Sequence, residues 1–241
     1  DITTASVNSS TGLVTGVSSG SITITYTKSS SPCVEASTTY AITVNSTIHS
    51  INDGDWSDVN IWPGGSKPTA NQNIRISNNI NVNENTATLS TLTVDDSKTL
   101  IVSTGNTVTV SGASDVNGTI SVTGNYDANG SFDGTSGTVT INSGGNLYLS
   151  STVTSLGTLS NSGTLHFDGS STQTIPGNSS KGTQPLGDFA VDGANKTLAN
   201  DGTTKYTMTA LTFGGGSPDL EVNSQAVSYT HLRAHETLGN L

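Results

Sequence analysis

Cysteine, aromatic residues and charged residues are all scarce in this chain. The single cysteine, Cys33, cannot form an internal disulfide or build a thiolate metal site, which needs several Cys or His ligands at short spacing. Aromatic residues make up 5% of the sequence and charged residues 11%, so the charge density of typical disorder and the long apolar runs of a membrane protein are both missing. We therefore expect no zinc or redox centre and no membrane insertion in this part of the protein.

Basic residues are the rarer kind of charge. The chain has 8 Lys and Arg against 18 Asp and Glu, which gives a formal net charge of −10. Binding to a phosphate backbone depends on Lys and Arg, so nucleic acid is excluded as a partner.

Serine, threonine and asparagine are abundant instead, together with 27 glycines. These residues favour strands and turns, whereas good helix formers are few, so the composition predicts an all-β protein. The polar first residues, 1–10, contain no basic stretch and no apolar stretch, so we expect any signal peptide to lie upstream. The composition permits a secreted or cell-surface location.

The end of the chain, 227–241, changes composition abruptly. It brings in His231, Arg233 and His235 within the string VSYTHLRAHET. This string resembles the translation, in one frame, of a sequencing-library adapter. We therefore expect 227–241 to be a non-native tail whose deletion changes the melting temperature by no more than about 2 °C.

Residues 1–45 contain two stretches of period-two alternation, SITITYT from Ser21 and TTYAITV from Thr38. They predict two half-buried antiparallel strands, with Ile22, Ile24 and Tyr26 on one face. The string V-N-x-x-T-G-L-V-T-G-V-x-x-G-x-x-T-I-T resembles the second half of the bacterial immunoglobulin-like domain, group 2, a β-sandwich found in tandem on surface adhesins. The resemblance implies a partial immunoglobulin-like sandwich; the alternative is an unrelated pair of β-hairpin strands.

Residues 46–72 carry both tryptophans, Trp56 and Trp62, between turn residues. Repeat proteins need caps at their ends, so we expect this segment to be a cap and linker in which the two rings cover the end of a β stack. The pattern GDWSD…IWPGGSKPTANQNIRI resembles the opening of parallel β-solenoid regions in large secreted bacterial surface proteins. Gln72 and Asn73 depart from that pattern, in which Asp is typical before the first strand.

Three carboxylates, Asp53, Asp55 and Asp58, surround Gly54 in this segment. Calcium takes six to eight oxygen ligands, so the three together are the best candidate for a calcium site. The bidentate Glu of a full EF-hand loop is missing, and turn and cap chemistry is the alternative for all three residues.

Residues 73–226 repeat short strands at a fixed spacing. The motifs at Thr91, Thr99 and Thr107 follow one another at eight-residue steps, and those at Thr138 and Asn146 repeat the step. This pattern predicts a right-handed parallel β-solenoid in which each strand pairs with the strand one turn later; an antiparallel sandwich is the alternative. The predicted inward positions are Leu92, Val94, Leu100, Val102, Val108, Val110, Ile120, Val122, Val139, Ile141, Leu147, Leu149, Leu159, Leu165 and Phe167.

Candidate catalytic residues are few. Arg75 is the only arginine outside the tail, and Asp95 with Asp96 occupies a turn in which Asp is expected to accept backbone hydrogen bonds. Asp127 and Asp133 are a second carboxylate pair, considered as an ion site and weaker than Asp53, Asp55 and Asp58. We therefore expect no enzyme activity and name no catalytic residue.

The two resemblances imply a structural or adhesive segment of a large secreted or cell-surface bacterial protein, with surface glycans as possible partners. Two alternatives stay open. One is a β-helix domain that cuts polysaccharides by elimination or hydrolysis. The other is a carbohydrate-binding module with a sugar-stacking strip of Tyr126, Phe132 and Tyr148, although single aromatics on a solenoid more often belong to the core.

Overall fold

A computed structural model describes residues 5–16, 20–30, 33–44, 46–177, 182–199, 204–214 and 218–221, and the backbone of 226–232. The chain divides into two compact units, Asp1–Thr47 and Ile48–Leu241. Apart from two short 3-10 turns, Val59–Ile61 and Pro63–Gly65, the regular elements in these ranges are all strands, which confirms the all-β prediction. None of the described residues belongs to a helix long and apolar enough to cross a membrane.

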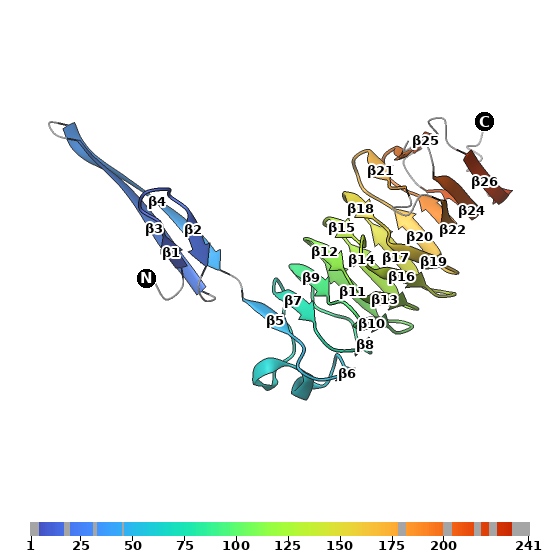
Figure 1. Ribbon diagram of the computed structural model, residues 1–241, viewed down its shortest axis with the longest axis horizontal. Helices are drawn as coiled ribbons and strands as arrows, with labels where there is room; N and C mark the ends of the chain where they lie inside the picture. The colour runs from blue at the N-terminus through green and yellow to red at the C-terminus, as the bar shows by residue number, and fades with distance from the viewer. Residues whose placement is uncertain are drawn as a thin grey trace, which may run out of the picture. The chain divides into compact units, whose positions relative to one another are not determined.

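The first unit contains two antiparallel strand pairs (Figure 1): β1 (Ala5–Val7) with β2 (Val14–Gly16), and β3 (Gly20–Ser30) with β4 (Cys33–Val44). The antiparallel pairing of the two predicted strands is confirmed. Ile22 and Ile24 are half-buried, but Tyr26 is 66% exposed. Among the described residues the two pairs are separate two-stranded sheets, so the immunoglobulin-like sandwich is not confirmed.

The second unit is a parallel β-solenoid (Figure 1), and from Thr91 to Phe167 the chain passes through three sheets in each turn. The first face contains β5 (Thr47–His49), β7 (Asn73–Ile76), β9 (Thr91–Val94), β12 (Ser114–Val116), β15 (Phe132–Asp133) and β18 (Val153–Ser155). The second face contains β6 (Gly54–Asp55), β8 (Ile80–Val82), β10 (Thr99–Val102), β13 (Thr119–Val122), β16 (Thr138–Ile141) and β19 (Thr158–Asn161).

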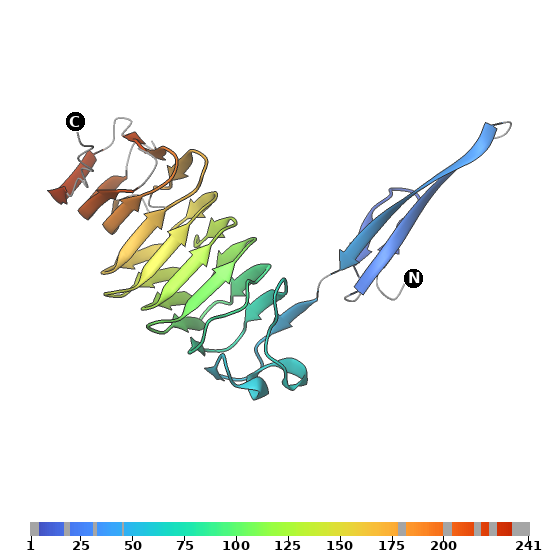
Figure 2. The ribbon, with the colours of Figure 1, turned by 180° about the vertical axis from the view of Figure 1, so that it is seen from behind.

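The third face contains β11 (Thr107–Val110), β14 (Asn125–Ala128), β17 (Asn146–Leu149), β20 (Thr164–Phe167), β22 (Thr183–Val191), β24 (Lys205–Phe213) and β26 (Ala226–Leu232). A separate terminal sheet consists of β21 (Gln173–Ile175), β23 (Lys196–Leu198) and β25 (Leu220–Glu221). In Figure 2, the strands of successive turns lie side by side on the solenoid.

The eight-residue step of the sequence separates strands of one turn. Thr91, Thr99 and Thr107 begin β9, β10 and β11, which lie on three different faces. Each strand then pairs in parallel with its equivalent about 20 residues later, as Thr99 does with Thr119 on the second face. The parallel solenoid is therefore confirmed, and its right-handed sense stays a prediction.

Alternating side chains fill the interior of the solenoid. All fifteen predicted inward positions are buried, with exposed fractions between 0% and 7%. Burying one such aliphatic side chain contributes about 1.5–3 kcal/mol. Because every turn adds several of them to one continuous core, apolar burial along the whole stack stabilises the unit.

Glycines at the corners allow neighbouring turns to approach closely. A Cβ atom would lie 2.2 Å from the Asp95 carbonyl oxygen at Gly118 and 2.0 Å from the Gly112 carbonyl oxygen at Gly130. Real Cβ atoms do not approach that close to a backbone oxygen, so these corners require glycine. Gly118, Gly124 and Gly130 are six residues apart in the sequence and lie at three successive corners between strands.

The first turn of the solenoid lies within the segment expected to be a linker. Strand β6 pairs with β8 through Gly54 and Asp55, and β5 joins the sheet next to β7. Trp56 and Trp62 are 2% and 1% exposed, and their rings meet edge to face with centroids 4.8 Å apart. Both tryptophans are thus core residues of the first turn.

The last strand, β26, includes part of the tail that we expected to be non-native. Its backbone pairs in parallel with β24, for example at Tyr206 with Val227 and at Leu211 with Leu232. An open sheet edge offers backbone donors and acceptors that an added strand can use with little dependence on its sequence. Residues 227–232 therefore lie within the fold, whereas their resemblance to an adapter concerns their origin and stays a prediction.

Candidate functional site

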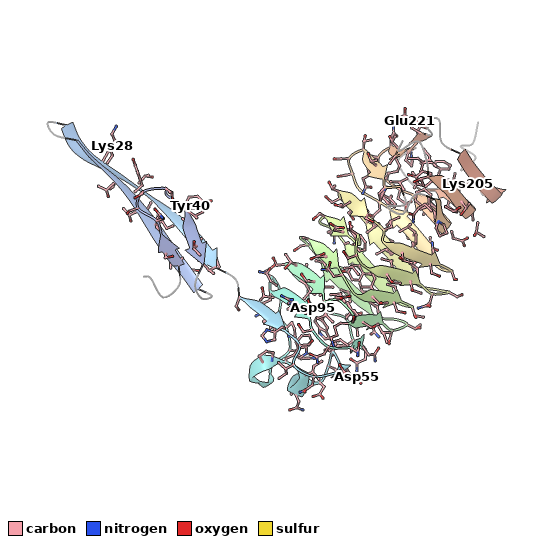
Figure 3. The ribbon with its side chains drawn as sticks, in the orientation of Figure 1. Lys28, Tyr40, Asp55, Asp95, Lys205 and Glu221 are labelled. Carbon is pink, nitrogen blue, oxygen red and sulfur yellow. The ribbon has the colours of Figure 1, made fainter. Side chains whose placement is uncertain are left out.

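The three carboxylates predicted to bind calcium each contact a different asparagine. Asp53 accepts a hydrogen bond of 2.8 Å from the Asn79 backbone N–H, and Asp55 accepts one of 2.7 Å from the Asn81 side chain. Figure 3 shows Asp55 at the edge of the first turn. These bonds connect the first turn of the solenoid to the second.

Asp58 serves as a cap for the short 3-10 turn that begins at Val59. Its Oδ1 accepts hydrogen bonds from both the backbone and side-chain nitrogens of Asn60, at 2.9 and 2.8 Å. Over the described ranges, no three His, Cys, Asp or Glu side chains gather as ligands for a metal ion. The calcium site stays a prediction, and the structure adds a hydrogen-bonding role for each of its members.

Asp95 has a role that the sequence did not reveal. Its carboxylate accepts hydrogen bonds from the Arg75 guanidinium, at 2.7 and 3.0 Å, and from the Ser77 hydroxyl at 2.8 Å. We expected backbone donors, but these partners are side chains of the preceding turn on the same face. The Arg75 side chain is 56% exposed, and solvent-exposed ion pairs contribute little to stability.

Of the three aromatic residues considered as a sugar-stacking strip, two belong to the core. Tyr126 and Phe132 are fully buried, and the Tyr126 hydroxyl donates to Ser114 Oγ at 3.0 Å. Burial raises the pKa of Tyr126 well above its ordinary value. Only Tyr148 lies on the outer surface, so the strip does not exist.

Tyr148 forms a stack with His166 on the third face. The two residues are in register on β17 and β20, and their rings stack with centroids 4.3 Å apart and an interplanar angle of 18°. His166 Nδ1 lies 3.2 Å from Asp192 Oδ2, and its Nε2 lies 3.4 Å from Asn146 Oδ1. Asp127 occupies the same register position on β14, next to Tyr148.

Three carboxylates surround this stack, and we call the group of Asp127, Tyr148, His166, Asp168 and Asp192 the Tyr148–His166 face. Burial raises the pKa of the Tyr148 hydroxyl, and the negative charges of Asp168, Asp192 and Asp127 raise it further. Burial and the charge of Asp168 also raise the pKa of Asp127, whereas a hydrogen bond from Asn129 lowers it. The predicted pair of Asp127 and Asp133 does not form, because Asp133 lies on the first face.

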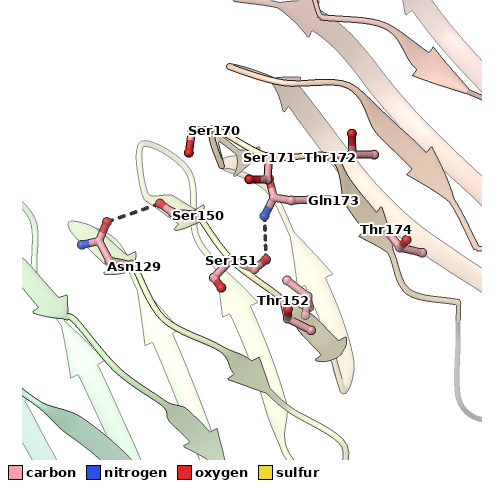
Figure 4. A pocket seen from close by; sticks show the side chains of 10 residues that line it. Asn129, Ser150, Ser151, Thr152, Ser170, Ser171, Thr172, Gln173 and Thr174 are labelled. Atoms are coloured by element: carbon pink, nitrogen blue, oxygen red, sulfur yellow. Dashed lines mark hydrogen bonds between the residues drawn. The ribbon is translucent and has the colours of Figure 1, made fainter.

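A groove opens beside this face, where the sheets of the solenoid are interrupted (Figure 4). The first face ends at β18, and β21 on the next turn begins the separate terminal sheet, so these two successive strands form no ladder. The cavity measures about 440 Å³ and is lined by Asn129, 150–153 and 170–174. We call it the Ser/Thr groove, because the triplet Ser-Ser-Thr occurs on both sides, at 150–152 and at 170–172.

The side chain of Gln173 bridges the interruption. Its Nε2 donates to the carbonyl oxygens of Leu149, at 2.8 Å, and Ser151, at 2.7 Å, while its Oε1 accepts from the Gly169 N–H at 2.9 Å. Gln173 is only 6% exposed. One amide side chain thus satisfies backbone groups that the missing ladder leaves open.

Lys196 fills the same corner one turn later, in register with Gln173. Its side chain is fully buried, and its Nζ donates to the Gly169 carbonyl oxygen at 3.1 Å. Burial lowers the pKa of Lys196, and the charges of Asp168 and Asp192 oppose that change. Two long polar side chains, Gln173 and Lys196, therefore lie buried behind the groove.

Several hydroxyl groups of the groove are free to bind a ligand. Within the described part of the chain, the side chains of Ser151, Thr152, Ser170, Ser171 and Thr172 form no hydrogen bond with a protein group. Ser150 connects the groove to the Tyr148–His166 face, because its hydroxyl donates to Asp168 at 2.8 Å. A residue that lines the groove thus contacts a carboxylate of the Tyr148–His166 face.

Sequence reasoning missed the Ser/Thr groove entirely. The repeated triplet Ser-Ser-Thr was a visible signal, but it looked like the turn chemistry that fills the whole chain. The deciding residues are Gln173 and, one turn later, Lys196, which are long polar side chains at positions where earlier turns have apolar residues, such as Phe132 and Val153.

Comparisons with protein-family models, with curated proteins and with solved structures find no match for this chain.

Proposed function

We propose that this chain is a structural and adhesive segment of a large secreted or cell-surface bacterial protein. The observation that carries the proposal is the uninterrupted third face, on which seven strands from β11 to β26 pair in parallel over one apolar core. Such a stack forms a rigid rod in which every turn is hydrogen-bonded to its neighbours. Rigid rods suit a stalk that holds binding surfaces away from a cell.

The outer surface agrees with this role. The described strands point short polar side chains outward, such as the Thr99, Thr119, Thr138 and Thr158 column on the second face. A formal net charge of −10 also keeps such segments apart at high local density on a surface.

Two measurements test this proposal. Digestion with thermolysin should leave the solenoid intact, because cleavage requires local opening of backbone that is hydrogen-bonded on both sides. Beads coated with the chain should attach to polysaccharide-coated or cell-coated surfaces more than beads coated with albumin. Rapid digestion within 73–177 would contradict the stalk role, and attachment equal to that of albumin would contradict the adhesive role.

The Tyr148–His166 face favours a second candidate function, a polysaccharide hydrolase. Hydrolysis of a glycosidic bond uses two carboxyl groups, one as a general acid of raised pKa. Asp127 has a raised pKa, and Asp168 contributes to it. Incubation with plant and algal polysaccharides, with new reducing ends as the readout, separates the two candidates. Release of reducing ends that Asp127→Asn abolishes would favour the hydrolase over the stalk.

A further inference from the structure

We propose that the Ser/Thr groove binds an uncharged oligosaccharide, with the hydroxyls of 150–152 and 170–172 as its hydrogen-bonding partners. The inference deepens the adhesive role proposed above and rests on it, because it names the ligand class and the site of contact.

The first argument is the unused hydrogen-bonding capacity of the groove. Ser151, Thr152, Ser170, Ser171 and Thr172 have no protein partner for their hydroxyls among the described residues. Each hydroxyl can donate one hydrogen bond and accept two. A sugar presents the same mixture of donors and acceptors along its edge, so the two surfaces are chemically complementary.

The second argument is the shape of the groove. Its walls come from two successive turns of a rigid stack, and Gln173 fixes their separation through hydrogen bonds to Leu149 and Ser151. A cavity of about 440 Å³ falls within the range typical of small-ligand sites. Because the walls are preformed, little conformational entropy is lost when a ligand enters.

The third argument is charge, which selects among sugars. No lysine or arginine is among the lining residues, and the Asp168 carboxylate accepts a hydrogen bond from Ser150 at the rim. Uronic acids and sulfated sugars would meet this carboxylate directly, because the Lys196 side chain is fully buried behind the groove and donates to the Gly169 carbonyl oxygen, and like charges repel at short distance. The ligand is therefore an uncharged sugar chain.

The expected affinity is weak. No aromatic ring lines the groove, so binding depends on hydrogen bonds that replace bonds to water, and each contributes only a small net free energy. We expect a dissociation constant in the millimolar range for one groove. Many copies of the chain on one surface would strengthen attachment through multivalency.

The test is a titration of the full chain, labelled with ¹⁵N, followed by amide chemical shifts. The probes are cellohexaose, xylohexaose, mannohexaose, maltohexaose and laminarihexaose, with hexagalacturonate as the anionic comparison. At millimolar concentration, at least one uncharged probe should shift the amides of 150–152 and 170–174, and hexagalacturonate should not. The proposal is overturned if no uncharged probe shifts these amides or if hexagalacturonate shifts them equally.

A pair of matched double variants adds a second readout. Ser151→Ala with Thr172→Ala removes two free hydroxyls from the groove, and binding should weaken about tenfold or more, given the modest value of each hydrogen bond. Thr104→Ala with Ser143→Ala makes the same change at exposed turns of another corner and should leave binding unchanged. Equal binding by both double variants would reject the groove as the site.

The bead assay separates failure of this inference from failure of the adhesive role. If beads coated with the Ser151→Ala and Thr172→Ala variant attach as well as the unmodified chain, the adhesive role stands and the groove assignment fails. If unmodified beads do not attach but the amides of the groove still shift, the groove assignment stands and the adhesive role fails.

Discussion

The indole Nε1 of Trp62 donates a hydrogen bond to the carbonyl oxygen of Trp56 at a distance of 3.0 Å. Both residues are buried in the first turn of the solenoid, so the bond pairs two polar groups that water cannot reach. It joins the strand that ends at Asp55 to the 3-10 turns that follow.

Two replacements of Trp62 should therefore distinguish the contribution of packing to stability from that of the hydrogen bond. Trp62→Ala should lower the free energy of unfolding by about 3–5 kcal/mol, because it leaves a large cavity. Trp62→Phe keeps most of the apolar surface but leaves the Trp56 carbonyl without a partner, so we expect a loss of about 2 kcal/mol. Urea unfolding followed by circular dichroism measures both. Equal losses for the two variants would show that the hydrogen bond, and not the packing, dominates.

Gly130→Ala should destabilise the solenoid by about 3 kcal/mol or more. The added Cβ would lie 2.0 Å from the Gly112 carbonyl oxygen of the neighbouring turn, so the backbone must move. Gly182→Ala is the control, because a Cβ there meets nothing within 4 Å and its φ is not in the left-handed region. The control should change the free energy of unfolding by no more than about 1 kcal/mol. A harmless Gly130→Ala would mean that the corner is open in solution.

Gln173→Met should cost about 2–4 kcal/mol. The substitution keeps the length and apolar contacts of the side chain, but the Ser151 carbonyl and the Gly169 N–H lose their partner. Gln72→Met removes a single hydrogen bond of 2.7 Å to the Thr69 N–H at an exposed turn. We expect that control to cost less than about 1 kcal/mol, and similar losses for both variants would contradict the bridging role of Gln173.

The stability of the solenoid should respond to pH through Asp127. Its pKa is raised in the folded state above the ordinary value of 3.8, so the folded state holds the proton more tightly than the unfolded state. This tighter binding of the proton stabilises the folded state. The stabilisation is fully present below pH 3.8 and is lost as the pH rises through the folded-state pKa. Asp127→Asn should therefore be more stable than the unmodified chain at pH 7, with the difference vanishing at pH 3.

Chemical unfolding at the two pH values measures this effect. Asp115→Asn makes the same change of charge at an exposed position on the first face and serves as the control. A stability gain in Asp127→Asn that persists unchanged at pH 3 would show that the gain does not come from ionisation.

Calcium removal decides the metal prediction made from the sequence. If Asp53, Asp55 and Asp58 share an ion, millimolar calcium should raise the melting temperature relative to EDTA, and Asp58→Asn should abolish that rise. Asp58→Asn keeps an oxygen that can accept from Asn60, so the cap itself survives. Identical melting curves in calcium and in EDTA would reject the site.

The regular part of the fold was predictable because each strand requires alternating apolar side chains and each tight corner requires glycine. Alternation placed Leu92 and Val94 inside, and glycine spacing followed the corners at Gly118 and Gly130, where the neighbouring backbone leaves no room for a side chain. These rules hold wherever successive turns repeat the same geometry.

The irregular parts could not be predicted because they depend on contacts between turns. The ion pair between Asp95 and Arg75 depends on the register of β7 against β9, which one sequence alone does not fix. The stack of Tyr148 on His166 needs the same information for β17 and β20. The start of the solenoid was placed too late, since β6 is only two residues long and Gly54 with Asp55 shows no alternation.

The interruption between β18 and β21 also has a consequence for the order in which the solenoid comes apart. From β9 to β20, successive turns are held together by ladders on all three faces, whereas turns after the interruption connect to them mainly through the third face and Gln173. Under pulling force or mild denaturant, the block from β21 onward should therefore detach first and as one cooperative unit. In amide hydrogen exchange, we expect strands before the Ser/Thr groove to be more protected than strands after it.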